Sequence, residues 1–174
     1  MTRRCREISV GLGTIGLLLA AGCSQRIELA QVTPEAMKTL KTTFPRATVT
    51  EVKRQYVWGL KVYEAELKQG DEFKQGDESE QGDKEIEVKL SLDGVIIEVE
   101  AELLMEEVPP AVAKAITEAA KGSEVTEIER VDVLGKIESG KVVKLSKPKV
   151  FYEAEYRKLG LPVKIKVGPD GSRL

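Results

Sequence analysis

VPPAVAK, residues 108–114, repeats the pattern of VTPEAMK, residues 32–38, at an offset of 76 positions. Three further landmarks follow in the same order: VTEV at 49–52 with VTEI at 125–128, YEAE at 63–66 with YEAE at 152–155, and Asp-Gly at 93–94 with Asp-Gly at 170–171. Four landmarks in one order indicate an internal duplication.

Each copy predicts a short helix. Thr33 can cap the first helix, whose first turn accepts Pro34, and Pro45 stops it. The second helix begins near Pro110 and stops at Gly122. The apolar stripes of the two helices are Ala36, Met37, Leu40 and Phe44, and Val112, Ala113, Ile116 and Ala120. Because such short helices are marginal alone, each needs a surface to cover.

Alternation of apolar and polar residues predicts the strands that supply this surface. The alternating apolar residues are Tyr63, Ala65 and Leu67; Ile86, Val88, Leu90 and Leu92; Val95, Ile97 and Val99; Tyr152, Ala154 and Tyr156; and Val163, Ile165 and Val167. Asp93-Gly94 and Asp170-Gly171 indicate hairpin turns and antiparallel pairing. We therefore predict an α+β fold of two tandem repeats, residues 32–104 and 105–174, each a helix packed on an antiparallel β-sheet.

The N-terminal segment has a basic start, an apolar stretch from Val10 to Ala21, and the sequence LAAGC at 19–23. It resembles a bacterial lipobox. The resemblance implies a lipoprotein signal peptide at 1–22, a lipidated Cys23, and a short tether at 23–31. An ordinary cleaved signal or a short anchor helix stays open, although about twelve apolar residues are too few to span a bilayer.

This N-terminal segment predicts a lipid-anchored protein of the cell envelope. Ser24, directly after the cysteine, suits the periplasmic side of the outer membrane if the cell has two membranes. The membrane is thus one expected partner, reached through the N-terminal lipid anchor.

Composition excludes several function classes. The net charge is −2, and it becomes −4 once residues 1–22 are removed with three arginines and one glutamate. A mildly acidic chain has no general attraction for nucleic acid. Histidine is absent, which removes Ser-His and Cys-His nucleophiles and HExxH zinc sites. The folded part also lacks a free thiol, so we expect no catalytic residues, no metal site and no cofactor.

The mature chain resembles the PepSY-like family, also described as β-lactamase-inhibitor-like. The resemblance rests on VPPAV at 108–112, VTEI at 125–128, FYEAEY at 151–156, and VKIKV at 163–167 with Asp170-Gly171. It covers almost the whole mature chain in two copies, the second clearer. It implies an exported protein that binds or inhibits another protein, such as a peptidase. The matching residues belong to the scaffold, so no contact residue carries over.

The outer sheet face is the main candidate site. The residues that alternate with the core in repeat one are nearly all acidic: Glu64, Glu66, Glu85, Glu87, Lys89, Glu98, Glu100 and Glu102. Glutamate is depleted in strands and like charges oppose pairing, so this face carries a cost with no visible compensation within its own strands. It predicts either a binding face for a basic partner or a sheet protected from aggregation.

Three other features are candidates. Trp58, near a turn, is a binding anchor or, the reading we favour, a core residue. A Lys-rich loop at 135–149 includes Lys144 and Lys147. The Gln-Gly-Asp run at 69–84 extends a hairpin by local duplication, and its acids (Asp71, Glu72, Asp77, Glu78, Glu80 and Asp83) do not follow the EF-hand order.

We therefore expect a non-catalytic module that binds or inhibits a protein of unknown identity. The alternative is a calcium-binding envelope protein that uses the acidic hairpin and the acidic sheet face. A third class, a glycosidase-like enzyme, needs two carboxylates across a cleft, and no such pair stands out in the sequence.

Overall fold

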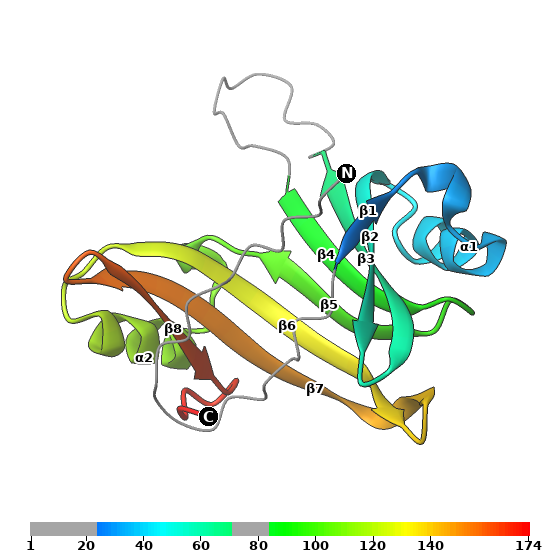
Figure 1. Ribbon diagram of the computed structural model, residues 1–174. Coiled ribbons are helices and arrows are strands. Elements are labelled where there is room, and N and C mark those ends of the chain that lie inside the picture. Colours follow the sequence, from blue (N-terminus) through cyan, green and yellow to red (C-terminus); the bar gives the residue numbers. More distant parts are fainter. Residues whose placement is uncertain (1–23, 71–83) are drawn as a thin grey trace.

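The computed structural model describes residues 24–70 and 84–174 (Figure 1). The expected signal peptide at 1–22, Cys23 and the acids of the Gln-Gly-Asp run lie outside the described residues. Strands hold 57% of the described residues and helices 20%, so the sheet dominates the fold. Neither α-helix in the described part has the length and apolarity to cross a membrane.

Eight strands form the sheet, and every strand pairs antiparallel with the next one along the chain. The strands are β1 (Gln25–Ile27), β2 (Ala47–Val57), β3 (Leu60–Gln69), β4 (Lys84–Ser91), β5 (Ile96–Glu102), β6 (Val125–Glu138), β7 (Lys141–Lys158) and β8 (Leu161–Val167). The helices are α1 (Pro34–Thr43) and α2 (Pro110–Ala120), preceded by the 3-10 helices Leu29–Gln31 and Met105–Glu107. Residues 25–31, assigned above to a tether, thus form β1 and a 3-10 helix.

The predicted fold class of two tandem helix-on-sheet repeats is wrong, because the chain forms one continuous antiparallel sheet. β5 pairs with β6 from Glu98↔Val133 to Glu102↔Glu129, which joins the strands before α2 to those after it. The last strand of a separate unit would leave a row of unpaired backbone groups at a sheet edge. Pairing with β6 satisfies those groups, and periodicity within each half does not reveal this partner.

The Lys-rich loop expected at 135–149 is also wrong. β6 continues to Glu138 and β7 begins at Lys141, so only Ser139 and Gly140 form the turn. The register is interrupted between Val133↔Lys149 and Gly135↔Lys144, where Pro148 lies. Lysine and proline are both poor strand formers, which explains why the pattern looked like a loop.

Both predicted helices are confirmed. Thr33 caps α1, since its hydroxyl accepts a hydrogen bond from the Ala36 N–H (3.4 Å) and donates one to the Leu92 carbonyl. α2 begins at Pro110 and ends where Lys121 takes a left-handed conformation before Gly122. Thr33 therefore ties the start of α1 to the sheet as well as capping it.

Both helices pack on the same face of the sheet. Ala36 and Leu40 of α1 meet Ala65, Leu67 and other apolar residues of β2–β5. Apolar residues of α2 meet β6–β8 through Ile128, Ala154 and Val167, among others. The alternate residues of these strands form the opposite face, which neither helix covers.

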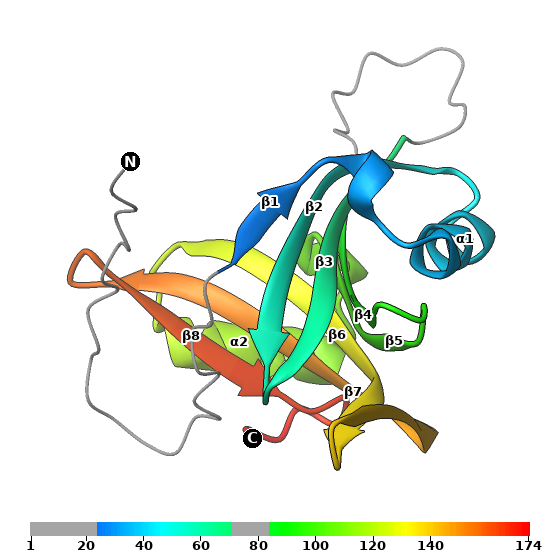
Figure 2. The same ribbon diagram turned by 45° about the vertical axis from the view of Figure 1, so that its right-hand side comes forward.

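The sheet is strongly curved, and the helices lie on the outside of the curve (Figures 1 and 2). Charges on non-adjacent strands influence each other across the inside of this curve. Lys166 on β8 acts on the pKa of Glu98 on β5, three strands away. The helix-free face is therefore concave, and we call it the concave face below.

Candidate functional site

The six acids predicted as partner-binding all lie together on the concave face. They come from three neighbouring strands: Glu64 and Glu66 on β3, Glu85 and Glu87 on β4, and Glu98 and Glu100 on β5. Register partners in antiparallel strands share a face, and this places the side chains in three neighbouring rows across the sheet. The alternation of apolar and polar residues therefore correctly predicted that these six acids share one face of the sheet.

One row is entirely acidic. Glu51 on β2 opposes Glu66, Glu66 opposes Glu87, and Glu87 opposes Glu100. We call these four residues the acidic row. Each like-charge opposition costs up to about 1 kcal/mol, so the row stores unfavourable electrostatic energy.

The adjacent row alternates in sign, with the order Lys53, Glu64, Lys89 and Glu98 from β2 to β5. Lys53 Nζ lies 2.5 Å from Glu66 Oε1 and 3.8 Å from Glu64 Oε1. Lys89 Nζ lies 2.8 Å from Glu98 Oε1 and 3.7 Å from Glu100 Oε1. The expectation of an uncompensated face is therefore corrected, because these two lysines offset part of the acidic charge.

Burial outweighs the effect of these lysines on the pKa values of Glu87 and Glu100. Burial raises the pKa of Glu87 to about 7, and the neighbouring Glu64 charge acts in the same direction. Burial also raises the pKa of Glu100 to about 8, assisted by its hydrogen bond with Glu98. Burial acts against ionisation of Glu98 too, but the charge of Lys89 prevails and lowers the Glu98 pKa below its usual value.

The apolar floor of the concave face accounts for part of this burial. Val131 on β6 is the register partner of Glu100 and is only 1% exposed, although it lies on the side without helices. Phe151 on β7 is the next residue across, and Lys166 Nζ lies 4.8 Å from its ring centroid. Neighbouring apolar groups remove water from a carboxylate and disfavour its charged form.

A second acidic group extends the site onto β6 and β7. Glu102, Glu129 and Glu153 oppose one another across β5, β6 and β7. Lys166 Nζ contacts Glu153 Oε1 at 2.6 Å, whereas burial and the charge of Glu127 raise the pKa of Glu129. The concave face thus carries glutamates on six strands, from β2 to β7.

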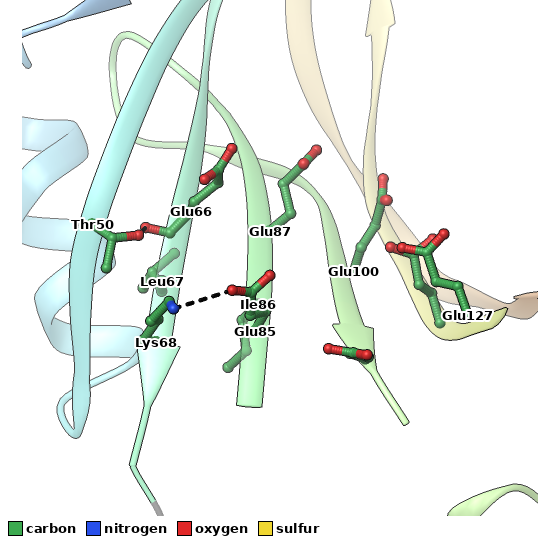
Figure 3. Close-up of a pocket in the computed structure, with 11 residues that line it drawn as sticks. Thr50, Glu66, Leu67, Lys68, Glu85, Ile86, Glu87, Glu100 and Glu127 are labelled. Atoms are coloured by element: carbon green, nitrogen blue, oxygen red, sulfur yellow. Dashed lines mark hydrogen bonds and ion pairs between the residues drawn. The ribbon is translucent and has the colours of Figure 1, made fainter. Parts of the chain in front are cut away.

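A pocket of about 220 Å³ lies between the two acidic groups. Figure 3 shows the carboxylates of Glu66, Glu87, Glu100 and Glu127 standing on four neighbouring strands, with Lys68 paired to Glu85 nearby. The pocket is smaller and more polar than a typical small-molecule site, because such sites span about 300–1,000 Å³ and are mostly apolar. Its lining suits a cationic side chain.

The other predicted residues lie elsewhere. Trp58 is 64% exposed at the β2–β3 turn, so the favoured core reading is wrong. Lys144 and Lys147 lie on β7, in the hairpin that it forms with β6. None of these three residues belongs to the concave face rows.

Sequence reasoning missed Glu51, Lys53, Glu127 and Glu129. They lie on β2 and β6, the two strands for which no clean alternation was found. The repeated sequences VTEV and VTEI could have identified them, because these contain Glu51 and Glu127 and directly precede Lys53 and Glu129. The two landmark glutamates face the same side of the sheet as the acids of β3 and β7.

The described residues contain no group of three or more Asp, Glu, His or Cys side chains arranged to hold a metal ion. The carboxylates of the concave face are spread along rows and are engaged by Lys53 and Lys89. This geometry gives no support to a cation site on the sheet face, and the acidic hairpin lies outside the described residues.

Comparison with known proteins indicates the fold. No protein-family model matches the chain, and no curated protein matches it. The chain is similar to the crystal structure of a BLIP-like protein from Bacteroides fragilis, with a TM-score of 0.54, 20% identity and 82% of each chain covered. It is similar to a DUF2874 family protein from Bacteroides uniformis, with a TM-score of 0.53, 18% identity, and 81% of this chain and 85% of that chain covered.

A third similar structure is a proposed periplasmic protein from Bacteroides eggerthii, with a TM-score of 0.52 and 14% identity over 82% of this chain and 86% of that chain. At these identities the likeness shows the fold alone. The chain therefore has a BLIP-like fold, in agreement with that part of the sequence resemblance.

Proposed function

We propose that the protein is a lipid-anchored protein of the cell envelope that binds another protein through its concave face and does not catalyse a reaction. Lipidation at Cys23 and removal of residues 1–22 would place the module on the periplasmic side of a membrane. The description of one similar structure as periplasmic and of another as BLIP-like supports this setting and role. Inhibition of an envelope enzyme such as a peptidase is one form that the binding can take.

The acidic row is the observation that carries the proposal. A continuous series of opposed glutamates, Glu51 to Glu100, is unfavourable within the free protein. The pKa values of Glu87 and Glu100 are raised mainly by burial, and the charges of neighbouring glutamates act in the same direction. A basic partner surface would relieve the repulsion on binding, so the cost within the free protein becomes a gain in the complex.

The chemistry of the face also defines the partner. Lysine or arginine side chains would enter the pocket between Glu66, Glu87 and Glu127, where water is already partly excluded. Phe151 offers apolar contact beside them, next to the buried Val131. Charged groups around a small apolar centre are typical of protein interfaces.

Site-specific crosslinking tests this proposal. A photo-crosslinking amino acid is placed in the full chain at Glu66 or Glu127 on the concave face, and at Lys38 or Lys114 on the exposed sides of the helices. We expect one defined protein adduct in cells from the concave positions and none from the helix positions. Adducts from the helix positions alone would contradict the proposal.

The calcium-binding alternative has a direct test. Calcium titration of the chain is monitored by thermal unfolding, and a specific site stabilises the folded state in proportion to its occupancy. A rise in Tm that is absent with magnesium and is lost when Asp71, Asp77 and Asp83 are changed to asparagine would favour that function over the present proposal.

A further inference from the structure

The β2–β3 turn exposes large aromatic side chains. Trp58 is 64% exposed and Tyr56 is 48% exposed, while Lys61 Nζ lies 5.7 Å from the Tyr56 ring centroid. Exposed tryptophan and tyrosine beside lysine is a combination typical of surfaces that lie at the interface of a bilayer.

The backbone at this turn makes the tryptophan costly. Trp58 has φ 51° and Gly59 has φ 78°, a conformation that favours Asn-Gly and disfavours a bulky residue at the first position. Trp58 therefore serves neither the turn nor the core. The exposed ring is therefore available for a contact outside the chain.

A second basic turn lies beside the first. Gly140, Lys141 and Val142 of the β6–β7 hairpin line the same pocket of about 680 Å³ as Tyr56 and Lys61. Figure 1 shows these two hairpins ending at the same side of the molecule, below the curve of the sheet. Tyr56 is thus accompanied by Lys61 and Lys141, with Asp93 also in the pocket lining. Lysines near anionic lipid contribute about 1 kcal/mol each.

The described chain begins next to this end. Gln25 of β1 pairs with Arg54 of β2, and β1 runs away from the β2–β3 turn. Ser24 therefore lies on the side of Tyr56 and Trp58, one residue after the proposed lipidation site. A lipid on Cys23 would hold this end of the module at the bilayer, because no long tether separates the two.

We propose that the Tyr56–Lys61 turn, together with Lys141, docks on the surface of the bilayer that carries the N-terminal lipid. The inference rests on the proposed lipid anchoring and fixes which end of the module meets the membrane. The acidic row lies about 20 Å along β2 and β3 from the turn, at about 3.3 Å per residue. The concave face therefore stays available to a protein partner.

The β7–β8 turn provides a matched control. Leu159 is 96% exposed and occupies the same left-handed position before Gly160 that Trp58 occupies before Gly59. This turn has no aromatic residue, and Figures 1 and 2 place it well away from β1. Asn at either position suits the turn, so neither change threatens the fold.

The first experiment uses the full lipidated chain in vesicles of phosphatidylethanolamine and phosphatidylglycerol. Trp58 is the sole tryptophan, so its fluorescence reports this turn alone. We expect a blue-shifted emission that lipids brominated near the headgroup quench at least twofold. Emission typical of water and no quenching would overturn the docking.

The second experiment is independent of the lipid anchor. Every described core residue lies at Ile27 or later, so a chain from residue 23 with Cys23→Ser retains both helices and the whole sheet. We expect this chain to float with vesicles containing phosphatidylglycerol, Trp58→Asn to reduce flotation at least fivefold without lowering Tm, and Leu159→Asn to change nothing. Equal effects of the two changes would overturn the inference.

Crosslinking separates this inference from the proposed function. If Trp58→Asn abolishes the protein adduct formed at Glu66 and leaves flotation unchanged, the turn belongs to the protein-binding surface and the membrane docking is wrong. If flotation is lost and the adduct persists, docking is supported and the concave face acts separately.

Discussion

Glu87 and Glu100 are register partners on β4 and β5, and both hold their protons at a higher pH than an ordinary glutamate. Burial is the main cause for each, and their neighbours are mostly acidic. The two raised pKa values can be measured, and they distinguish this part of the concave face from an ordinary glutamate-rich surface.

Stability should fall as pH rises from about 5 to about 8.5. The folded pKa values of about 7 for Glu87 and about 8 for Glu100 lie above the usual 4.5. The folded state therefore binds more protons than the unfolded state in this window, and the free energy of unfolding decreases with pH. The lowered pKa of Glu98 acts at lower pH and in the opposite direction. Urea unfolding across this range measures the decrease.

The raised pKa of Glu129 acts in the same direction, so substitution is needed to assign this pH effect to Glu87 and Glu100. The chain has no histidine, so no other side chain with an ordinary pKa titrates between pH 5 and 8. The double variant Glu87→Gln and Glu100→Gln should lose most of the pH dependence in this window. An unchanged slope in that variant would show that other groups are responsible.

Lys89→Met should destabilise the fold by about 2 kcal/mol at pH 7, between the values for an exposed pair and a buried one. The lysine side chain is only 13% exposed and contacts both Glu98 and Glu100. Its removal leaves these carboxylates without their cation. Lys68→Met is the matched control, because the Lys68–Glu85 pair is largely exposed and should cost under about 1 kcal/mol. Equal losses of unfolding free energy in the two variants would contradict the larger stabilising role assigned to Lys89.

Gly94→Ala should cost about 3 kcal/mol or more. A Cβ at Gly94 would lie 2.8 Å from the Glu35 carbonyl oxygen of α1, and the residue also has φ +82°. Gly59→Ala meets the same backbone penalty at φ +78° with no atom within 4 Å, so it should cost only about 1–2 kcal/mol. Chemical denaturation of both variants isolates the contact between the β4–β5 turn and α1.

The sequence predicts the local elements and one face of the sheet well. Alternation around Tyr63, Val88 and Val99 identifies β3, β4 and β5, and it follows that Glu64, Glu87 and Glu98 share the opposite face. This inference succeeds because side chains alternate strictly along a strand.

The global arrangement is beyond such patterns. The pairing of β5 with β6 depends on which edge needs a partner, and the apparent repeats pointed instead to two separate units. Trp58 was taken for a core residue because tryptophan is usually buried, but its place before Gly59 in a tight turn leaves the ring exposed. The burial that raises the pKa of Glu100 involves its register partner Val131, a residue on another strand.

The central claim is that the acidic concave face binds a basic protein, and affinity measurement tests it most directly. The partner identified by crosslinking is titrated against three forms of the chain from residue 23 with Cys23→Ser. These are the parent, a concave variant with Glu64, Glu66, Glu85 and Glu87 changed to glutamine, and a control with Glu35, Glu106, Glu118 and Glu124 changed to glutamine.

Both variants replace four glutamates, but the control residues are exposed and lie on α1, on α2 and in the segments that flank α2. The account predicts that the concave variant binds at least tenfold more weakly, equivalent to about 1.4 kcal/mol, while the control binds within about twofold of the parent. Equal affinities for the parent and the concave variant would contradict the claim.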